Sequence, residues 1–214
     1  VLTGSSAINA VGNGLNNTIN GSSNVAGNLL QGLSGNDTYV VGVGDIVDET
    51  AVGSSGYDII SSALAVDLSD ITRVKGAIEF LVLTGTAAVS GTGNALNNGL
   101  TGNSANNSLN GGLGNDVLNG GLGNDILIGG AGSDFFVFNS ALNALTNKDT
   151  ISDFNAAADT IRLENAIFTA FSAVAANATI ATGAFKANAT GTATDADDRI
   201  VYNTTTGALF YDTN

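Results

Sequence analysis

The stretch Gly111–Val137 reads GGLGNDVLN, GGLGNDILI and GGAGSDFFV, three consecutive copies of one nine-residue unit. Each copy has glycine at positions one, two and four, aspartate at position six and a large apolar residue at position eight. We expect the six-residue glycine loop to reverse the chain and the last three residues to form a strand whose middle side chain points inward. Two units then make one turn of a coil with two short parallel sheets. Because one unit cannot bury its apolar face alone, neighbouring turns must stack.

The nine-residue period extends toward the N-terminus beyond the acidic copies. Its leading glycines are Gly93, Gly102, Gly111, Gly120 and Gly129. The apolar residues that follow them are Leu100, Leu109, Leu118, Leu127 and Phe136. At Asn98 and Asn107, asparagine takes the place of the aspartate. These units are predicted to continue the coil without metal or with weaker metal binding, since asparagine suits the same turn. A flexible spacer is the alternative, and the strict apolar spacing argues against it.

The chain carries this design twice. Residues 2–23, LTGSSAINAVGNGLNNTINGSS, align without gaps with residues 83–104, LTGTAAVSGTGNALNNGLTGNS. The first copy places Asn17 where the second has Asn98, and it ends in the single acidic loop Gly32–Asp37. Ile19, a blurred Leu29/Leu30 and Tyr39 are its expected inward residues. Residues 40–83 read as a more irregular β insert with three β-rich runs.

Composition narrows the chemistry to oxygen ligands. The 214 residues contain 19 acidic and 6 basic side chains, for a net charge of -13, and neither cysteine nor histidine. Nucleic acid and anionic membranes are poor partners for such a surface. Without thiolates or imidazoles, only oxygen is plentiful, and oxygen suits hard cations such as calcium. Residues 166–185 are too polar for a membrane span, so we expect no membrane insertion.

The motif G-G-x-G-x-D-x-U-x, with U a large apolar residue, resembles the calcium-binding repeat of RTX proteins. That resemblance implies an all-β fold, a calcium-binding parallel β-roll (a two-sheet β-solenoid of nonapeptide repeats) with an irregular β insert and a C-terminal β-rich cap. It also implies calcium as the bound ion, export from Gram-negative bacteria by the type I secretion machinery, and a secreted, extracellular location, with the cell surface as a variant.

The calcium ligands are predicted from the repeat geometry. Calcium takes six to eight oxygens, many of them carbonyls, so one carboxylate per loop suffices if successive turns sandwich the ion. Loops two units apart face each other, so Asp116 and Asp134 are expected to share a site. Asp125 needs a partner from beyond the repeats, either Asp149 or Asp153. The glycines that expose carbonyls are Gly112, Gly114, Gly121, Gly123, Gly130, Gly132 and, in the first copy, Gly35.

Calcium binding is predicted less strongly for the first acidic loop, because a single glycine-rich turn that ends in Asn-Asp is also an ordinary turn. If Asp37 binds calcium, its partner must come from the insert. Asp58 is the preferred candidate, with Asp45 and Glu49 as alternates.

The rest of the chain also resembles RTX proteins. Residues 149–163, DTISDFNAAADTIRL, resemble the segment that closes the β-roll, and residues 198–212 resemble a terminal hairpin. Residues 165–178 form either a short helix or a loop or strand. We expect three units: 1–82, a repeat unit with one calcium loop and the insert; 83–138, the β-roll; and 139–214, a capping and secretion-associated region. The chain shows no leader at Val1, so we expect part of a longer protein, with its secretion signal cut short or absent after Asn214.

The predicted function is a calcium-binding module that folds on extracellular calcium after type I secretion and stabilises or anchors a larger secreted protein. One alternative is a calcium-dependent adhesin or surface-layer element that self-associates. Another is an accessory domain of a secreted hydrolase or epimerase. The sequence has neither a zinc-binding HExxH nor a GxSxG nucleophile motif, so these residues are not expected to form an enzyme.

Overall fold

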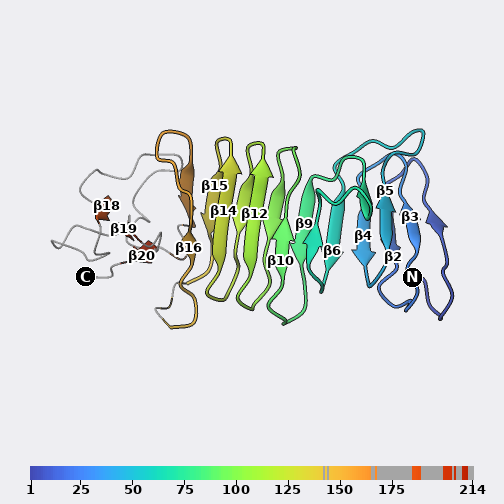
Figure 1. Ribbon diagram of the computed structural model, residues 1–214, viewed down its shortest axis with the longest axis horizontal. Helices are drawn as coiled ribbons and strands as arrows, with labels where there is room; N and C mark the ends of the chain where they lie inside the picture. Colours follow the sequence, from blue (N-terminus) through green and yellow to red (C-terminus); the bar gives the residue numbers. More distant parts are fainter. Residues whose placement is uncertain are drawn as a thin grey trace.

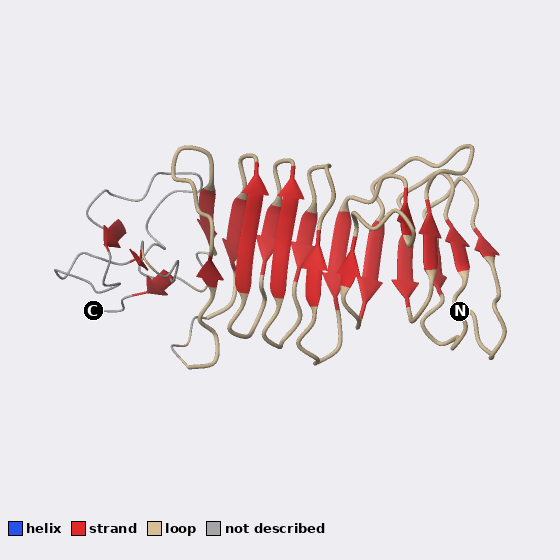
Figure 2. Ribbon diagram, viewed as in Figure 1, coloured by secondary structure: helices blue, strands red, loops and turns tan. Residues whose placement is uncertain are grey.

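The computed structural model describes residues 1–141, 143, 145–164, 167, 185–188, 200–203, 205 and 209–211. These residues form strands and loops but no helix, which confirms the predicted all-β class (Figure 2). The strands of residues 10–163 lie in parallel sheets that wind into a β-solenoid of about seven turns, as predicted for a β-roll (Figure 1). Among the described residues there is no helix long and apolar enough to cross a membrane.

One sheet runs the whole length of the solenoid. In spatial order its eight strands are β17 (Thr160–Leu163), β15 (Phe135–Phe138), β13 (Val117–Asn119), β11 (Gly99–Thr101), β9 (Phe80–Leu83), β6 (Ile59–Ser62), β4 (Thr38–Val41) and β2 (Thr18–Asn20).

The opposite face is divided into two sheets. The first contains β1 (Ala10–Val11), β3 (Leu29–Gln31), β5 (Ile46–Asp48) and β8 (Val74–Lys75). The second contains β16 (Thr150–Ile151), β14 (Ile126–Ala131), β12 (Ser108–Leu113), β10 (Ser90–Thr92) and β7 (Val66–Asp67). The predicted insert therefore continues the same solenoid.

The division arises between β6 and β9, where the chain makes two short strands. β7 pairs with β10 of the following turn, and β8 pairs with β5 of the preceding turn. The chain thus pairs first with the following turn and then with the preceding turn before it enters the continuous sheet again at β9. β7 and β8 lie on either side of a seam without pairing to each other.

The core is a stack of inward side chains, most of them from the middle of a strand. Leu100 stands in register with Leu118, and Leu109 with Leu127, an offset of 18 residues that equals two nonapeptides. The largest side chains with less than 2% exposure are Leu30, Tyr39, Ile60, Ile78, Leu81, Leu100, Leu109, Leu118, Leu127, Phe136 and Ile151. The predicted two-unit turn and its inward apolar residues are confirmed, because burial of this stack is what drives such repeats to associate.

A separate three-stranded sheet lies near the C-terminus. It contains β18 (Phe185–Asn188), β19 (Ile200–Asn203) and β20 (Leu209–Tyr211). β19 and β20 pair antiparallel, as the predicted terminal hairpin requires. The predicted helix or loop at 165–178 lies outside the described residues apart from Ile167. The division into three units remains a prediction.

Candidate metal centre

Polar side chains line both edges of the solenoid, each directly before a strand, except at Val89 on the second edge. We call the loops that lead into the eight-stranded sheet the first edge and those that lead out of it the second edge. On the first edge the residues before successive strands are Asn17, Asp37, Asp58, Glu79, Asn98, Asp116, Asp134 and Asp159. On the second edge they are Asn9, Asn28, Asp45, Arg73, Val89, Asn107, Asp125 and Asp149.

Each carboxylate of the first edge binds the backbone of the turn before it. The Asn98 N–H donates to Oδ1 of Asp116 at 2.7 Å, and the Asp116 N–H donates to Oδ1 of Asp134 at 2.8 Å. The Asp134 N–H donates to Oδ1 of Asp159 at 3.0 Å. Asp116 and Asp134 therefore stand one turn apart on the same edge, in the arrangement that the sequence predicts for a shared site.

The second edge repeats this pattern with Asp125 and Asp149. The Asn107 N–H donates to Oδ1 of Asp125 at 2.7 Å, and the Asp125 N–H donates to Oδ1 of Asp149 at 3.0 Å. Of the two residues considered as the partner of Asp125, the structure places Asp149 beside it. Asp153 lies on the first edge instead, where its two oxygens accept the N–H groups of Gly129 and Gly130 at 2.9 and 2.8 Å. Asp149 precedes β16 and Asp153 follows it, so this strand carries the two residues to opposite edges.

The second carboxylate oxygen of the repeat aspartates has no partner. Oδ2 of Asp116, Asp125 and Asp134 is buried and accepts no hydrogen bond, and the same is true of Asp37. These side chains are at most 1% exposed. A buried polar atom without a partner carries a desolvation cost of ~1–3 kcal/mol. Such an oxygen is therefore suited to a cation, and the ligand chemistry of these residues fits calcium.

The asparagines at the same positions leave no such atom. Oδ1 of Asn98 accepts the Asn94 N–H at 2.7 Å, and its Nδ2 donates to the Ile78 carbonyl of the preceding turn at 3.0 Å. Asn107 makes the corresponding bonds with Asn103 and Val89 at 2.8 and 3.0 Å. The side-chain amide of asparagine thus donates a hydrogen bond to a carbonyl of the neighbouring turn. An ionised aspartate at the same position has no proton to donate. This contrast supports the prediction that asparagine turns continue the coil without metal.

The loop glycines lie where no side chain fits. All seven glycines predicted to expose carbonyls have positive φ, among them Gly112 at 99° and Gly114 at 112°, in the region that favours glycine. A Cβ on Gly111 would meet Oδ2 of Asp116 and would come within 2.5 Å of the Gly129 carbonyl oxygen. Carbonyls of one turn and the carboxylate of another therefore converge beside this glycine. Among the described residues no three acidic side chains converge on one point, so carbonyls must supply most of the ligands.

Burial makes these carboxylates reluctant to ionise. It raises the pKa of Asp125 to about 7, and the charge of Asp149 adds to this shift. It raises the pKa of Asp116 to about 6, with a further contribution from the charge of Asp134. The pKa values of Asp134 and Asp149 are also raised, mainly by burial. Since burial disfavours the charged form of an acid, a bound cation would stabilise the ionised form of these buried groups.

The acidic loop of the first copy occupies the first edge with its predicted partner. The Asp37 N–H donates to Oδ1 of Asp58 at 2.8 Å, so Asp58 stands one turn after Asp37. Of the two alternates, Asp45 lies on the second edge, where its oxygens accept N–H groups of Asn28 and Gly42. Glu49 lies on the first edge, near Asp37. The metal-binding roles of all these residues remain predictions.

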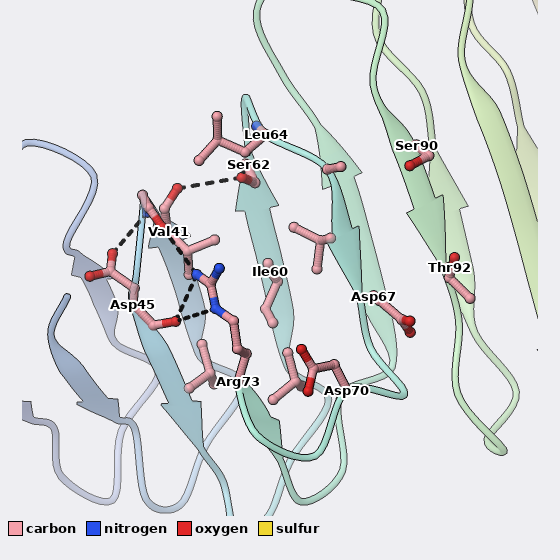
Figure 3. Close-up of a pocket in the computed structure, with 15 residues that line it drawn as sticks. Val41, Asp45, Ile60, Ser62, Leu64, Asp67, Asp70, Arg73, Ser90 and Thr92 are labelled. Carbon is pink, nitrogen blue, oxygen red and sulfur yellow. Dashed lines mark hydrogen bonds between the residues drawn. The ribbon is translucent and has the colours of Figure 1, made fainter.

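Arginine replaces the acid at one position of the second edge (Figure 3). Nε and Nη2 of Arg73 donate to the Asp45 carbonyl oxygen at 3.1 and 2.9 Å, and Nη2 reaches the Gly42 carbonyl at 3.4 Å. This guanidinium borders a cavity of about 320 Å³ at the seam, together with residues that include Asp67 and Asp70. A cation of the chain itself therefore meets the carbonyls at this point of the edge.

Sequence reasoning missed three edge residues, namely Glu79, Arg73 and Asp159. Glu79 continues the ladder after Asp58, whose N–H donates to its Oε2 at 2.8 Å. Asp159 carried a usable signal, because Asp-Thr-Ile occurs at 149–151 and again at 159–161. Both triplets place the acid directly before a strand. No local sequence pattern pointed to Arg73, because its role depends on which strand β8 pairs with.

Comparison with known proteins agrees with this geometry. A search of curated proteins found no match to the chain. Residues 101–136 match the family model of the RTX calcium-binding nonapeptide repeat, in four copies. The matched segment contains Asp116, Asp125 and Asp134 together with the asparagine turn at Asn107. Repeats of this family bind calcium and are typically structural rather than catalytic. Residues 101–136 of the chain thus carry RTX calcium-binding nonapeptide repeats.

Proposed function

We propose that this chain is a module whose folding depends on calcium held between stacked loops, by Asp116 with Asp134 on the first edge and by Asp125 with Asp149 on the second. The observation that carries the proposal is the buried Oδ2 of Asp116, Asp125 and Asp134, which has no hydrogen-bond partner. Calcium would supply the missing positive charge and cross-link neighbouring turns.

Calcium binding and folding are coupled in this proposal. The ligands of one site come from loops 18 residues apart in sequence on the first edge and 24 residues apart on the second, so each site exists only when the turns are stacked. The free energy of binding then becomes free energy of folding. Without calcium, several buried acids would have to be protonated or remain unpartnered, which disfavours the stacked state.

We further propose that folding takes place outside the cell after type I secretion and stabilises or anchors a larger secreted protein. Extracellular calcium modules bind at ~10⁻⁴–10⁻³ M, far above cytosolic calcium. The unfolded, acidic chain would therefore stay competent for export until it meets external calcium. The net charge of -13 is consistent with such a state, since mutual repulsion disfavours a compact apo chain.

The first test is a calcium titration followed by far-ultraviolet circular dichroism. The chain should gain β-structure cooperatively as calcium is added, with a midpoint in the submillimolar to millimolar range, and should lose it on chelation. Magnesium serves as the control, because its demand for a small octahedral site makes it a poor substitute. A chain that is fully β-structured in chelator and does not change with calcium would refute the proposal.

A reciprocal pair of variants locates the effect. Asp116→Asn should bind less calcium yet fold with less dependence on it, because the new amide can donate to a carbonyl as Asn98 does. Asn98→Asp should do the opposite and destabilise the calcium-free chain. If the two variants shift the calcium dependence of folding in the same direction, Oδ2 is not the atom that requires the metal.

A further inference from the structure

A row of glycines runs along the first edge, in register on successive turns, either within the strands of the divided face or directly after them. Its members, one per turn, are Gly12, Gly32, Gly76, Gly93, Gly111 and Gly129, with Glu49 between Gly32 and Gly76. Elsewhere this position lies against the carboxylate or amide of the loop, and a Cβ would collide with it, as at Gly32 and Gly111. Glu49 therefore introduces a side chain where the repeat design has none.

The Glu49 carboxylate is directed toward the Asp37 loop. Its Oε1 accepts the Gly32 N–H at 3.3 Å and a short hydrogen bond from the Tyr39 hydroxyl. A Cβ on Gly32 would collide with both Oδ2 of Asp37 and the Tyr39 hydroxyl. The carboxylates of Asp37 and Glu49 thus approach the same glycine from adjacent turns. Ser54 also lies near Glu49.

Two of the oxygens gathered here are buried acceptors without a partner. Oδ2 of Asp37 and Oε2 of Glu49 accept no hydrogen bond, on side chains that are 0% and 8% exposed. The Ser54 hydroxyl, which lies close to Glu49, is also buried without a hydrogen-bond partner. Among the described residues, the remaining buried unpartnered side-chain atoms are Oδ2 of Asp116, Asp125 and Asp134. Such atoms therefore gather in two places, the repeat loops and this one.

A second acid in the same row, Asp153, has a carboxylate whose two oxygens both accept hydrogen bonds. Asp153 follows Gly129 by one turn, as Glu49 follows Gly32. It places one oxygen on the Gly129 N–H and the other on the Gly130 N–H. In Glu49 the second oxygen, Oε2, accepts no hydrogen bond, either from the backbone N–H of Leu33 or from any other group. The unpartnered oxygen is therefore a particular feature of Glu49, and not a consequence of placing an acid in this row.

We propose that Asp37 and Glu49 form a separate calcium site in the first half of the chain, outside the matched repeats. Two carboxylates and neighbouring backbone carbonyls, with the Ser54 hydroxyl, make an oxygen-only ligand set for a hard divalent cation. The site differs from the repeat sites because one ligand comes from the glycine row, inside the solenoid. The choice of calcium rests on the function proposed above, whereas the location rests on Glu49.

Electrostatics support a cation at this place. Burial raises the pKa of Glu49 to about 7, and the charges of Asp58 and Asp37 add to the shift. Burial also raises the pKa of Asp37. Two acids that meet in a buried space destabilise each other when ionised. A divalent cation would neutralise both, and the alternative is a protonated Glu49 held by the Tyr39 hydroxyl.

The test is the number of calcium ions bound per folded chain, measured by native mass spectrometry and by calorimetric titration. Glu49→Gln should bind one ion fewer than the wild type. Asp48→Asn is the matched control. It removes the same charge at the neighbouring residue, from a carboxylate that accepts hydrogen bonds from Thr50. This variant should bind the full number of calcium ions. Equal calcium counts for Glu49→Gln and the wild type would overturn the proposal and leave Glu49 as a protonated partner of Tyr39.

Terbium provides a readout confined to this site. The chain has no tryptophan and four tyrosines, so replacement of Tyr57, Tyr202 and Tyr211 by phenylalanine leaves Tyr39 as the sole sensitiser. Terbium that replaces calcium at the proposed site should then emit on tyrosine excitation. The emission should be lost in Glu49→Gln and kept in Asp116→Asn. Retention of the emission in Glu49→Gln would contradict the proposal.

Two further comparisons separate a variant that does not fold from a site that does not exist, and separate failure of this site from failure of the proposed function. If Glu49→Gln does not fold, Asp37→Asn decides, because Asn17 and Asn98 occupy the same ladder in stable turns; it should also lose one ion and the terbium emission. If Asp116→Asn leaves the calcium count unchanged while Glu49→Gln lowers it, the proposed function of the repeats fails and this site stands. The reverse result rejects this site alone.

Discussion

At the scale of single residues, the loops differ most at their second position. In the repeats this position is glycine, with φ of 99° at Gly112, 91° at Gly121 and 95° at Gly130. The loop of the first copy has Leu33 there, with φ of 77°, and among the described residues it is the one non-glycine residue with positive φ. The left-handed region costs an L-residue with a Cβ ~1–2 kcal/mol. The Asp37 loop is therefore strained where the matched repeats are relaxed.

Leu33→Gly should stabilise the chain by about 0.5–1 kcal/mol. The relief of strain is partly offset by the greater freedom of glycine in the unfolded chain and by the loss of a half-buried side chain. The measurement is urea unfolding in saturating calcium, compared with Leu33→Ala, which keeps a Cβ and should gain nothing. A loss of stability in the glycine variant would mean that Leu33 packing outweighs its backbone strain.

At the scale of elements, the short strand β8 is held by an arginine where other turns use an amide or an acid. Arg73 precedes β8 and donates to the carbonyls of Asp45 and Gly42, at the start of β5 and in the loop before it. The guanidinium carries its own positive charge, so this part of the second edge requires no metal to satisfy its carbonyls. The first half of the chain is thus acidic along one edge and closed by a side-chain cation along the other.

Arg73→Met should lower stability by about 1 kcal/mol, the net worth of a few partly exposed hydrogen bonds. Because this contact needs no metal, the loss should be the same in saturating calcium at two concentrations tenfold apart. Arg73→Lys, which keeps the charge but loses the planar fork, should recover only part of it. Recovery of full stability at the higher calcium concentration would show that an ion can replace the guanidinium.

At the scale of the whole molecule, the raised pKa values make stability depend on pH in a direction opposite to that of an ordinary acidic protein. Burial raises the pKa of Asp116 and Asp58 to about 6 and of Asp125 and Glu49 to about 7, with neighbouring charges adding to the shift. The folded chain then holds protons that the unfolded chain, with pKa values of ~4, releases. Linkage requires folding to be favoured where these protons are bound.

In calcium-free buffer, the stability of the chain should therefore rise as the pH falls from 8 toward 5. The gain is complete near the unfolded pKa values and is lost as the pH rises through 6 to 7. In calcium the trend should reverse, because protons compete with the ion for the same oxygens. Circular dichroism at each pH, with chelator or with calcium, measures both. Stability that stays constant between pH 5 and 8 in chelator would contradict the assignment of these acids.

The sequence predicted most of the repeat region because its period is regular. Offsets of 18 residues place Leu100 over Leu118 and Asp116 one turn before Asp134, and these relations need only the nine-residue spacing. Outside the repeats the offset between paired strands ranges from Leu29 with Ile46 to Val47 with Val74. Periodicity then no longer indicates which residue faces which.

The features that sequence reasoning could not reach arise from this irregular spacing. Asp153 was expected near Asp125 as one of two candidates, but it follows β16 and so lies in the glycine row beside Gly129. Glu49 was an alternate partner for Asp37, yet its place in that row becomes visible only when β5 is paired with β3. Arg73 depends on β8 folding back onto β5, a choice of neighbour that no local pattern encodes.

The seam between β7 and β8 has a mechanical consequence. The eight-stranded sheet crosses this point without interruption, whereas the opposite face has no strand pairing there (Figure 1). Bending that opens the divided face would stretch no inter-strand hydrogen bonds at the seam, while bending in the sheet plane would shear those of the continuous sheet. The rod should therefore have unequal flexural stiffness, soft in one direction and stiff in the other. Under load the solenoid would bend mainly at the seam, while the segments on either side of the seam stay straight.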